Sequence, residues 1–242
     1  MIRLRIISTF VIYNEERTEG TKEQFAIVVT GFGPFGSQRI NASWEAVKRL
    51  TQIWKETKRN DNILLITEEI PVSYEFVQEQ VPKKWCSNKK QVQTKVQVMI
   101  HVGVRNVKRV TIEDRANNFG YSIPDINGKT PDNGRCVSVC NGDVYHMNGA
   151  GLIMPCTENI CLSTAFDVDK IVEYLNHSLG EGISEKSRDA GHYLCEFVYF
   201  KSLYTMDRRS LFIHVPTLDV VSAEQSADAI KLIIEYISKS FS

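Results

Sequence analysis

Continuous apolar runs alternate with amphipathic stretches along this chain of 242 residues, and this alternation constrains the fold most strongly. The runs FAIVVTGF (25–32) and VQVMIHVGV (96–104) carry apolar residues at nearly every position, which is typical of strands buried on both faces of a parallel sheet. Residues 42–54 and 167–179 instead repeat apolar side chains at helical spacing. The alternation predicts a single α/β domain around a mostly parallel sheet.

Further segments of both kinds extend this pattern. Strands are predicted over 62–70, 108–116 and 210–216, and helices over 74–81, 190–204 and 223–237. Residues 116–163 lose periodicity and gather Gly, Asn, Pro and Cys, a composition typical of loops. We therefore predict an N-terminal extension over 1–24 and one domain over 25–242.

Charge and hydropathy argue against several classes of protein. The 29 basic and 29 acidic residues give a net charge of zero, whereas a dedicated nucleic-acid binder needs concentrated Lys and Arg. No apolar run approaches the roughly 20 residues that span a bilayer. The N-terminal run 6–13 follows two arginines, but no small-residue cleavage site comes after it. We expect a cytoplasmic protein with no nucleic-acid or membrane partner.

Six cysteines raise the question of a metal site or a disulfide framework. They are too sparse for a small disulfide-stabilised fold. Four of them flank His146: Cys136, Cys140, Cys156 and Cys161. Their spacing lacks the tight C-x2-C pairs of most structural zinc sites, and the segment has no second histidine. Reduced, unligated thiols are the simpler interpretation.

The segment VTGFGPFGSQRINASW (29–44) contains the spacing G-x-G-x-x-G, which also occurs in dinucleotide-binding turns. In such a turn the helix starts within the glycine motif, so that its amides face the pyrophosphate. Here the helix cap is expected five to seven residues later, and Phe32 and Phe35 occupy what would be a small polar cradle. The phenylalanines either wall an apolar ligand pocket or fill the core beneath the loop. Spacing alone does not separate these two interpretations.

Several motifs occur together in an order and spacing that carry a family resemblance. They are VTGFGPFG, NASWEAV, EIPVSYEFV, HVGV, VTIE, SRDAGHYLCEFVYFKSL and FIHVP. From about residue 25 to 240, the chain closely resembles the pyroglutamyl-peptidase I family, also called pyrrolidone-carboxylate peptidases, and particularly its animal members. The resemblance implies an α/β/α sandwich and a cysteine peptidase that removes N-terminal pyroglutamyl residues from peptides. It also implies a Glu, Cys and His triad, no metal and no cofactor.

The resemblance assigns the triad to Glu113, Cys195 and His214, acting through a thioacyl-enzyme intermediate. The residues alone leave other interpretations open. Cys195 falls in the first turns of a predicted helix, where the helix dipole favours a thiolate, but a cysteine among apolar neighbours is usually inert core. His214 ends a predicted strand, as its structural rival His101 does. Glu113 could equally be a surface acid that pairs with Arg115.

Six further positions match the family's pocket for the pyrrolidone ring: Phe32, Phe35, Asn41, Ile123, Tyr193 and Leu194. Family members commonly carry a basic residue after the catalytic glutamate, where this chain has Asp114. Two other functions therefore stay open: a homologue that binds pyroglutamyl-blocked N-termini without turnover and, from the glycine motif, a nucleotide-binding oxidoreductase. The resemblance further implies peptides as partners and a monomer, with a homo-oligomer as the alternative.

Overall fold

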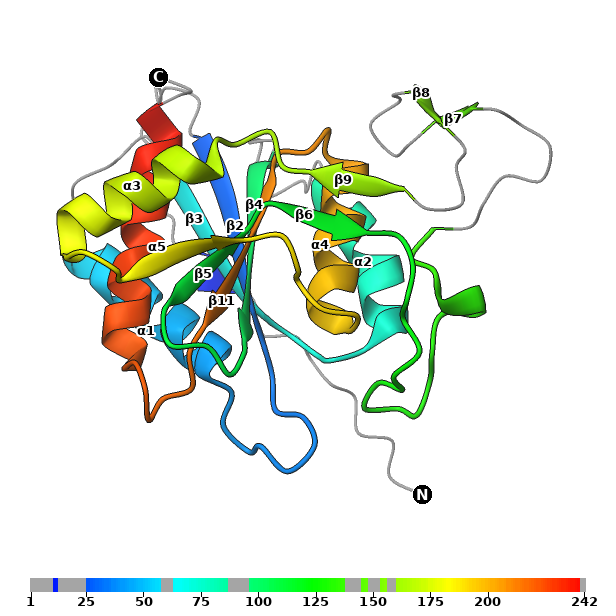
Figure 1. The fold of residues 1–242 in the computed structure, drawn as a ribbon, viewed down its shortest axis with the longest axis horizontal. Coiled ribbons are helices and arrows are strands. Elements are labelled where there is room, and N and C mark those ends of the chain that lie inside the picture. Colours follow the sequence, from blue (N-terminus) through cyan, green and yellow to red (C-terminus); the bar gives the residue numbers. More distant parts are fainter. Residues whose placement is uncertain are drawn as a thin grey trace.

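The computed structural model describes residues 11–12, 25–57, 63–86, 96–137, 145–147, 153–155 and 160–239. Its centre is a seven-stranded sheet (Figure 1). In spatial order the strands are β1 (Val11–Ile12), β3 (Ile63–Ile70), β2 (Phe25–Phe32), β4 (Val96–Val104), β11 (Ser210–Val215), β5 (Val110–Glu113) and β10 (Ser184–Ser187). Strands β3, β2, β4 and β11 run parallel, whereas β5 runs antiparallel to β11 and parallel to β10, and β1 is antiparallel to β3. The prediction of a mostly parallel sheet is confirmed.

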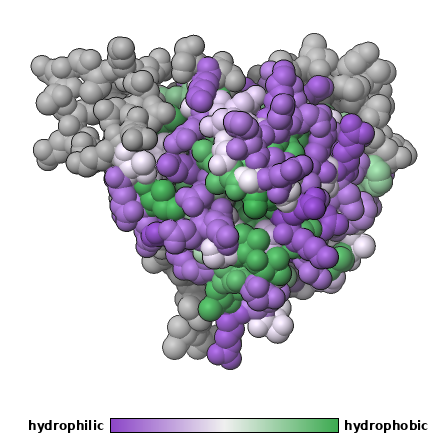
Figure 2. All heavy atoms as spheres, turned by 60° about the vertical axis from the view of Figure 1, so that its left-hand side comes forward, coloured by the Kyte–Doolittle hydropathy of each residue, from purple (hydrophilic) through white to green (hydrophobic). Residues whose placement is uncertain are grey.

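Helices cover both faces of the sheet. On one face lie α1 (Ala42–Thr57), α3 (Val168–Leu179) and α5 (Ala223–Ser238), and on the other lie α2 (Tyr74–Cys86) and α4 (Leu194–Thr205) (Figure 1). This is the α/β/α sandwich that the resemblance implied. Hydrophilic side chains predominate on the face that Figure 2 shows, with smaller hydrophobic patches between them, as expected where amphipathic helices meet solvent. None of the helices in the described part of the chain is long and apolar enough to cross a membrane.

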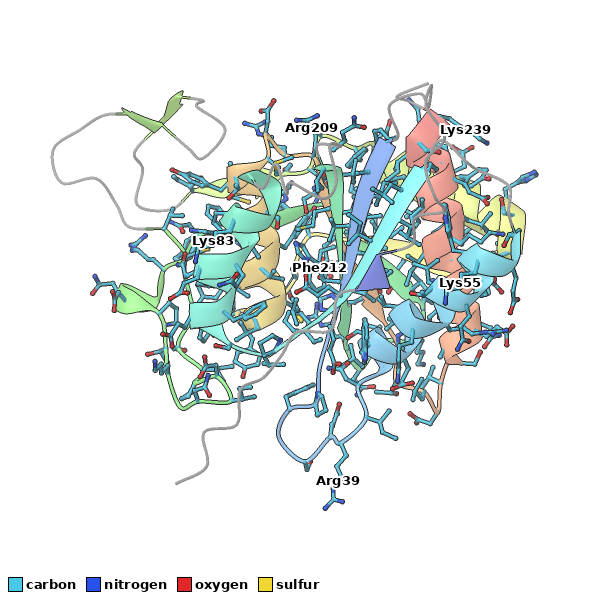
Figure 3. The ribbon with its side chains drawn as sticks, turned by 180° about the vertical axis from the view of Figure 1, so that it is seen from behind. Arg39, Lys55, Lys83, Arg209, Phe212 and Lys239 are labelled. Atoms are coloured by element: carbon cyan, nitrogen blue, oxygen red, sulfur yellow. The ribbon has the colours of Figure 1, made fainter. Side chains whose placement is uncertain are left out.

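Alternation along the central strands decides which side chains reach which layer. The odd-numbered residues of β11 pack in the apolar cluster shared with α1, α3 and α5, whereas Phe212 packs in the cluster shared with α2 and α4. Phe212 lies in the middle of the sheet (Figure 3). His214 takes the next alternate position and so faces α4, and in β4 the same alternation places Met99 and Gly103 on that side. The α4 face of the sheet therefore carries the candidate site.

Three elements differ from the sequence-based prediction. The strand expected over 108–116 ends at Glu113, and beyond Asp114 the chain forms β6 (Arg115–Asn117), which pairs with β9 (Cys161–Ser163) outside the main sheet. The pattern does not predict β10 because its residues, SEKS, are polar, as suits a strand at the edge of a sheet. The helix expected from residue 190 begins at Leu194, because Gly191 first adopts a φ of 87°.

The irregular region 116–163 also holds short elements: a 3-10 turn (Asp132–Gly134), β7 (Tyr145–Met147) and β8 (Ile153–Pro155). Cys140 and Cys156 lie outside the described residues, so the zinc and thiol interpretations are not tested there. Cys136 is buried and Cys161 exposed, and both are free thiols. The expected extension 1–24 also lies outside the described residues, except for β1.

Candidate active site

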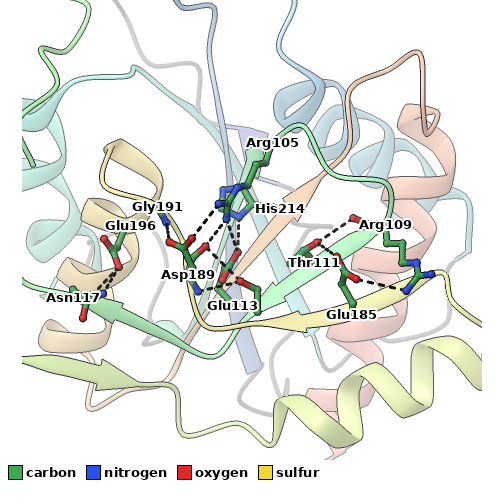
Figure 4. Close-up of polar contacts among 11 residues, drawn as sticks. Arg105, Arg109, Thr111, Glu113, Asn117, Glu185, Asp189, Gly191, Glu196 and His214 are labelled. Atoms are coloured by element: carbon green, nitrogen blue, oxygen red, sulfur yellow. Dashed lines mark hydrogen bonds and ion pairs between the residues drawn. The ribbon is translucent and has the colours of Figure 1, made fainter. Parts of the chain in front are cut away.

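A buried carboxylate and an imidazole meet on the α4 face of the sheet. In the antiparallel pair of β11 and β5, Glu113 lies opposite Phe212, and His214 lies opposite Thr111. Glu113 and His214 are therefore diagonal neighbours on one face. His214 Nδ1 lies 2.8 Å from Glu113 Oε1, and the two side chains are 2% and 0% exposed (Figure 4). A carboxylate can only accept a hydrogen bond, so this contact suits the imidazole tautomer that carries its proton on Nδ1 and a lone pair on Nε2.

Cys195 approaches the same face from α4. It is the second residue of this helix, after Tyr193 as N-cap. A Cβ atom at Gly103 would stand 2.9 Å from Cys195 Sγ and 2.7 Å from Phe212 Cζ. Gly103 is in turn the partner of His214 in the register of β4 and β11. Because paired positions on neighbouring strands project to one face, the thiol lies on the same face as the imidazole.

The surroundings of Cys195 favour its neutral thiol. Desolvation raises the pKa of Cys195 above its ordinary value, the negative charge of Glu113 raises it further, and the guanidinium of Arg105 lowers it. The side chain still keeps part of its surface exposed. Burial and the charge of Glu113 therefore favour the protonated thiol at neutral pH, and a cysteine in this state needs a base to take its proton before it can act as a nucleophile. His214 lies on the same face of the sheet and is a candidate for that base.

With Cys195 as the nucleophile that the resemblance assigns, Gly103→Ala is expected to lower turnover although it alters none of the three assigned triad residues. The new methyl group would overlap the thiol of Cys195 and the ring of Phe212, so one of them has to move. Displacing a reacting group by about 1 Å costs on the order of 100-fold in rate. Overpacking also costs about 1–3 kcal/mol in the free energy of unfolding. Steady-state kinetics and urea denaturation measure these two effects.

Gly182→Ala is the matched control for this change. Gly182 has a φ of 77° and its nearest neighbour is Arg109, so an alanine there strains the backbone without touching the thiol. It should lower stability and leave turnover unchanged. Wild-type turnover in a folded Gly103→Ala variant would contradict the prediction, because it would show that the site accepts a methyl group beside the thiol.

Four of the residues assigned to the substrate belong to, or pack against, the hydrophobic cluster that Cys195 also contacts. Phe32 and Leu194 lie inside the buried cluster shared with α2 and α4. Phe35 and Tyr193 pack against this cluster and stay partly exposed, as Cys195 does. Partly exposed rings on the cluster that also contacts Cys195 can offer an apolar contact surface to a ligand. The structure thus brings four of the six assigned residues into one cluster with the thiol.

Ile123, a fifth assigned residue, lies on a loop that two tyrosines hold in place. The Tyr74 hydroxyl donates to the carbonyl of Ile123, and the Tyr193 hydroxyl donates to the carbonyl of Pro124, both at 3.1 Å. Desolvation raises the pKa of both phenols, so they stay protonated donors at neutral pH. The Ile123 side chain is 53% exposed and can border a ligand at the surface. Sequence reasoning missed Tyr74, although the motif EIPVSYEFV contains it.

Asn41, the sixth assigned residue, holds the glycine loop together. It is 2% exposed, its Nδ2 donates to the carbonyl of Gly33 at 2.9 Å, and its Oδ1 accepts from the amide and hydroxyl of Ser43. These contacts give Asn41 a supporting role in the loop. Helix α1 begins at Ala42, beyond the glycine motif, and Arg39 at the loop tip points away from the domain (Figure 3). The loop therefore lacks the geometry of a dinucleotide-binding turn, in which the helix starts within the glycines.

His101, the rival histidine, has a structural environment. It is 0% exposed and lies between two hydroxyl groups. Its Nδ1 is 2.6 Å from Thr30 Oγ1, and its Nε2 is 2.6 Å from Ser202 Oγ. Both ring nitrogens are thus engaged in hydrogen bonds that join β2, β4 and α4, as expected for a satisfied buried histidine.

Asp114 lies in a cluster of cations. Its carboxylate is 15% exposed and lies 3.5 Å from Arg115, 3.6 Å from Lys186 and 3.4 Å from Arg188. These three side chains compensate its charge. The alternative in which Glu113 is a surface acid paired with Arg115 is wrong, because Glu113 is 0% exposed and Arg115 pairs with Asp114.

Glu196, the residue after the thiol, serves to hold β6 against α4. Its Oε1 accepts from the amide and the side-chain Nδ2 of Asn117 at 3.0 and 2.8 Å (Figure 4). Its Oε2 lies 3.3 Å from His192 Nδ1. Desolvation raises the pKa of Glu196 to about 7, against the effect of the Asn117 hydrogen bonds. This carboxylate fixes the chain that leads into the Ile123 loop.

Comparison with known proteins identifies the family. The sequence model for pyroglutamyl peptidases matches residues 25–148. The chain belongs to the pyroglutamyl peptidase family. It is 36% identical over 213 residues to pyroglutamyl-peptidase 1 of Homo sapiens, and this alignment covers 87% of this chain and 88% of that protein. It is 28% identical over 199 residues to the pyrrolidone-carboxylate peptidase of Thermococcus onnurineus, and this alignment covers 78% of this chain and 82% of that protein.

The fold also resembles that of a solved pyroglutamyl peptidase relative. The crystal structure of pyrrolidone carboxyl peptidase from Thermus thermophilus matches with a TM-score of 0.64 and 23% identity, over 86% of this chain and 98% of that one. This likeness concerns the fold alone.

The pyroglutamyl peptidases are cysteine peptidases. Among the described residues, no group of three or more His, Cys, Asp or Glu side chains is arranged to hold a metal ion.

Proposed function

We propose that this protein is a cysteine peptidase that hydrolyses the bond after an N-terminal pyroglutamyl residue of peptides. Cys195 is the nucleophile, His214 the general base and acid, and Glu113 the residue that orients His214. The observation that carries this proposal is the 2.8 Å hydrogen bond between His214 Nδ1 and Glu113 Oε1, which leaves Nε2 available for the thiol proton. Membership of the pyroglutamyl peptidase family supports the same reaction.

The first half of the reaction transfers the pyroglutamyl group to the enzyme. His214 Nε2 takes the thiol proton as the sulfur of Cys195 attacks the carbonyl carbon. The carbon–nitrogen bond then breaks, the imidazolium gives its proton to the departing amine, and a thioester remains. In the second half, His214 takes a proton from water, the resulting hydroxide attacks the thioester, and the sulfur leaves and regains the proton. Glu113 stabilises the imidazolium in both halves.

The first turn of α4 supports a site for the tetrahedral oxyanion. The N-cap residue, Tyr193, makes no side-chain hydrogen bond to the helix amides. The first amides of a helix have no partner within the helix, and the helix dipole favours negative charge at that end. An oxyanion on the carbon bonded to Cys195 would form close to these donors.

We assign the uncharged pyrrolidone ring to the apolar surface beside Cys195. An apolar surface suits a ring that carries no amine charge. The residues that would contact the ring are Phe32, Phe35, Ile123, Tyr193 and Leu194, with Asn41 supporting the loop that carries the two phenylalanines.

A pyroglutamyl coumarin amide is expected to be cleaved on the order of 10⁴-fold faster, in kcat/KM, than the prolyl amide. Proline lacks the ring carbonyl, so hydrogen-bond partners that serve the lactam would be left unpaired. An N-terminal glutaminyl amide should also be rejected, because it brings a charged amine into an apolar site. Fluorophore release under reducing conditions measures all three rates. Similar rates for pyroglutamyl and prolyl amides would contradict recognition of the lactam.

The alternative function is a homologue that binds blocked N-termini without turnover. Asp114 motivated this alternative, and the three cations around its carboxylate weaken that motive. Calorimetric binding of a pyroglutamyl peptide by folded protein that releases no fluorophore would support it. We expect a cytoplasmic monomer with no nucleic-acid or membrane partner, and size-exclusion chromatography with light scattering tests the oligomeric state.

A further inference from the structure

We propose that Arg105 is a positioning residue that sets the pH range of the site by acting on Glu113 and Cys195, an inference that rests on the proposed function. Arg105 follows β4 and reaches back toward the end of β5 (Figure 4). Its Nη1 lies 3.9 Å from Glu113 Oε1, and its Nη2 lies 3.3 Å from Asp189 Oδ2. A guanidinium stays charged over the whole accessible pH range.

Glu113 needs a compensating positive charge. Its carboxylate is 0% exposed, and an uncompensated charge in the interior is costly. Among the described residues, its ion-pair partners are His214 at 2.8 Å and Arg105 at 3.9 Å. His214 is positive only while it holds the catalytic proton. In the resting site, Arg105 is therefore the partner that supplies a permanent positive charge.

Asp189 fixes Arg105 to the turn that precedes α4. Asp189 Oδ1 accepts a hydrogen bond from the Gly191 amide at 3.0 Å, and the carbonyl of Asp189 accepts from Arg105 Nη1. The Arg105 amide donates to the carbonyl of Val215 at 3.1 Å, at the end of β11. Arg105 thus joins the start of the helix that carries the thiol to the strand that carries the imidazole.

The charges of Glu113 and Arg105 act on Cys195 with opposite signs. The charge of Glu113 raises the pKa of Cys195 and that of Arg105 lowers it. Phenols also face these groups: Tyr74 and Tyr193 near Cys195, and Tyr199, whose hydroxyl donates to the carbonyl of Glu113. Burial raises the pKa of all three phenols, so they carry no charge near neutral pH. Without Arg105, the thiolate loses stabilisation, and the field of Glu113 on the imidazolium grows.

Arg105→Gln is therefore expected to move both limbs of the pH profile of kcat/KM to higher pH, by about 0.5–1 unit for charges a few ångströms apart near solvent. Arg105→Met, which keeps the aliphatic stem, should shift the limbs in the same way. Arg105→Lys keeps the charge and should leave both limbs in place, whatever it does to the maximum. Thermal denaturation establishes that each variant folds.

Alkylation of Cys195 by iodoacetamide at fixed pH tests the same idea without turnover. The neutral variants should react about two- to threefold more slowly, because fewer thiolates form although each is more nucleophilic. Cys195→Ser supplies the blank for the other cysteines. If the wild type releases no fluorophore, the proposed function is wrong. The alkylation rates would still test the role of Arg105. Lower kcat/KM with unmoved limbs and unchanged alkylation in both neutral variants would reduce Arg105 to an anchor for the turn.

Discussion

Cys195→Ser is expected to lower kcat for the pyroglutamyl amide by at least about 10⁴-fold. Serine fills nearly the same volume, but its hydroxyl is a much weaker nucleophile than a thiol in a site arranged for sulfur. Removing the nucleophile of a triad costs almost as much as removing the whole triad, because the remaining members then have nothing to activate. The free energy of unfolding should change by about 1 kcal/mol or less, because Cys195 is only partly buried. Fluorophore release and urea denaturation measure the two quantities.

Cys161→Ser is the matched control. Cys161 is a free, exposed thiol on β9, outside the cluster that contains Cys195, so its replacement should leave turnover intact. Acid-quenched mass spectrometry of the wild type should also find a pyroglutamyl adduct on Cys195. Turnover above about 1% of wild type in folded Cys195→Ser, with no adduct on Cys195, would point to another nucleophile.

The central layer of the fold could be predicted because burial on both faces leaves a plain sequence pattern. The strands over 25–32 and 96–104 appear as runs with apolar residues at nearly every position, and the structure has β2 and β4 at those residues. The edge strand β10 shows no such run, because solvent allows polar side chains at Ser184–Ser187. The antiparallel direction of β5 could not be predicted either, because the composition of a strand does not indicate which neighbour it pairs with or whether the pair is parallel or antiparallel.

The site could be predicted only as far as the resemblance reached. That resemblance assigned Glu113 and His214, but their contact depends on the antiparallel register of β5 and β11, which no local pattern indicates. Gly103 lies in the motif HVGV, yet the need for glycine there becomes clear only with the sulfur of Cys195 above it. Arg105 is a single cation on a loop, and such residues usually carry no signal until their partners are known.

Glu113→Gln is expected to change turnover and the alkylation rate of Cys195 in opposite directions. Turnover should fall by about 10⁴-fold, because an amide can hold the imidazole in the wrong tautomer and carries no charge to stabilise the imidazolium. Alkylation of Cys195 by iodoacetamide at fixed pH should become faster. The charge of Glu113 raises the pKa of Cys195, so its removal lowers that pKa and increases the fraction of thiolate. Steady-state kinetics and alkylation rates on the same samples measure both changes.

Asp114→Asn is the control for this variant, since it removes the neighbouring carboxylate, whose charge three cations already compensate. It should change neither rate appreciably. The comparison also decides where the proton rests. If Glu113→Gln slowed alkylation in step with turnover, the resting site would hold a thiolate–imidazolium pair that Glu113 stabilises, and the neutral thiol inferred from burial would be wrong. If alkylation quickens here and slows in Arg105→Gln, the two charges act on the thiol with opposite sign, and proton transfer to His214 belongs to the reaction itself.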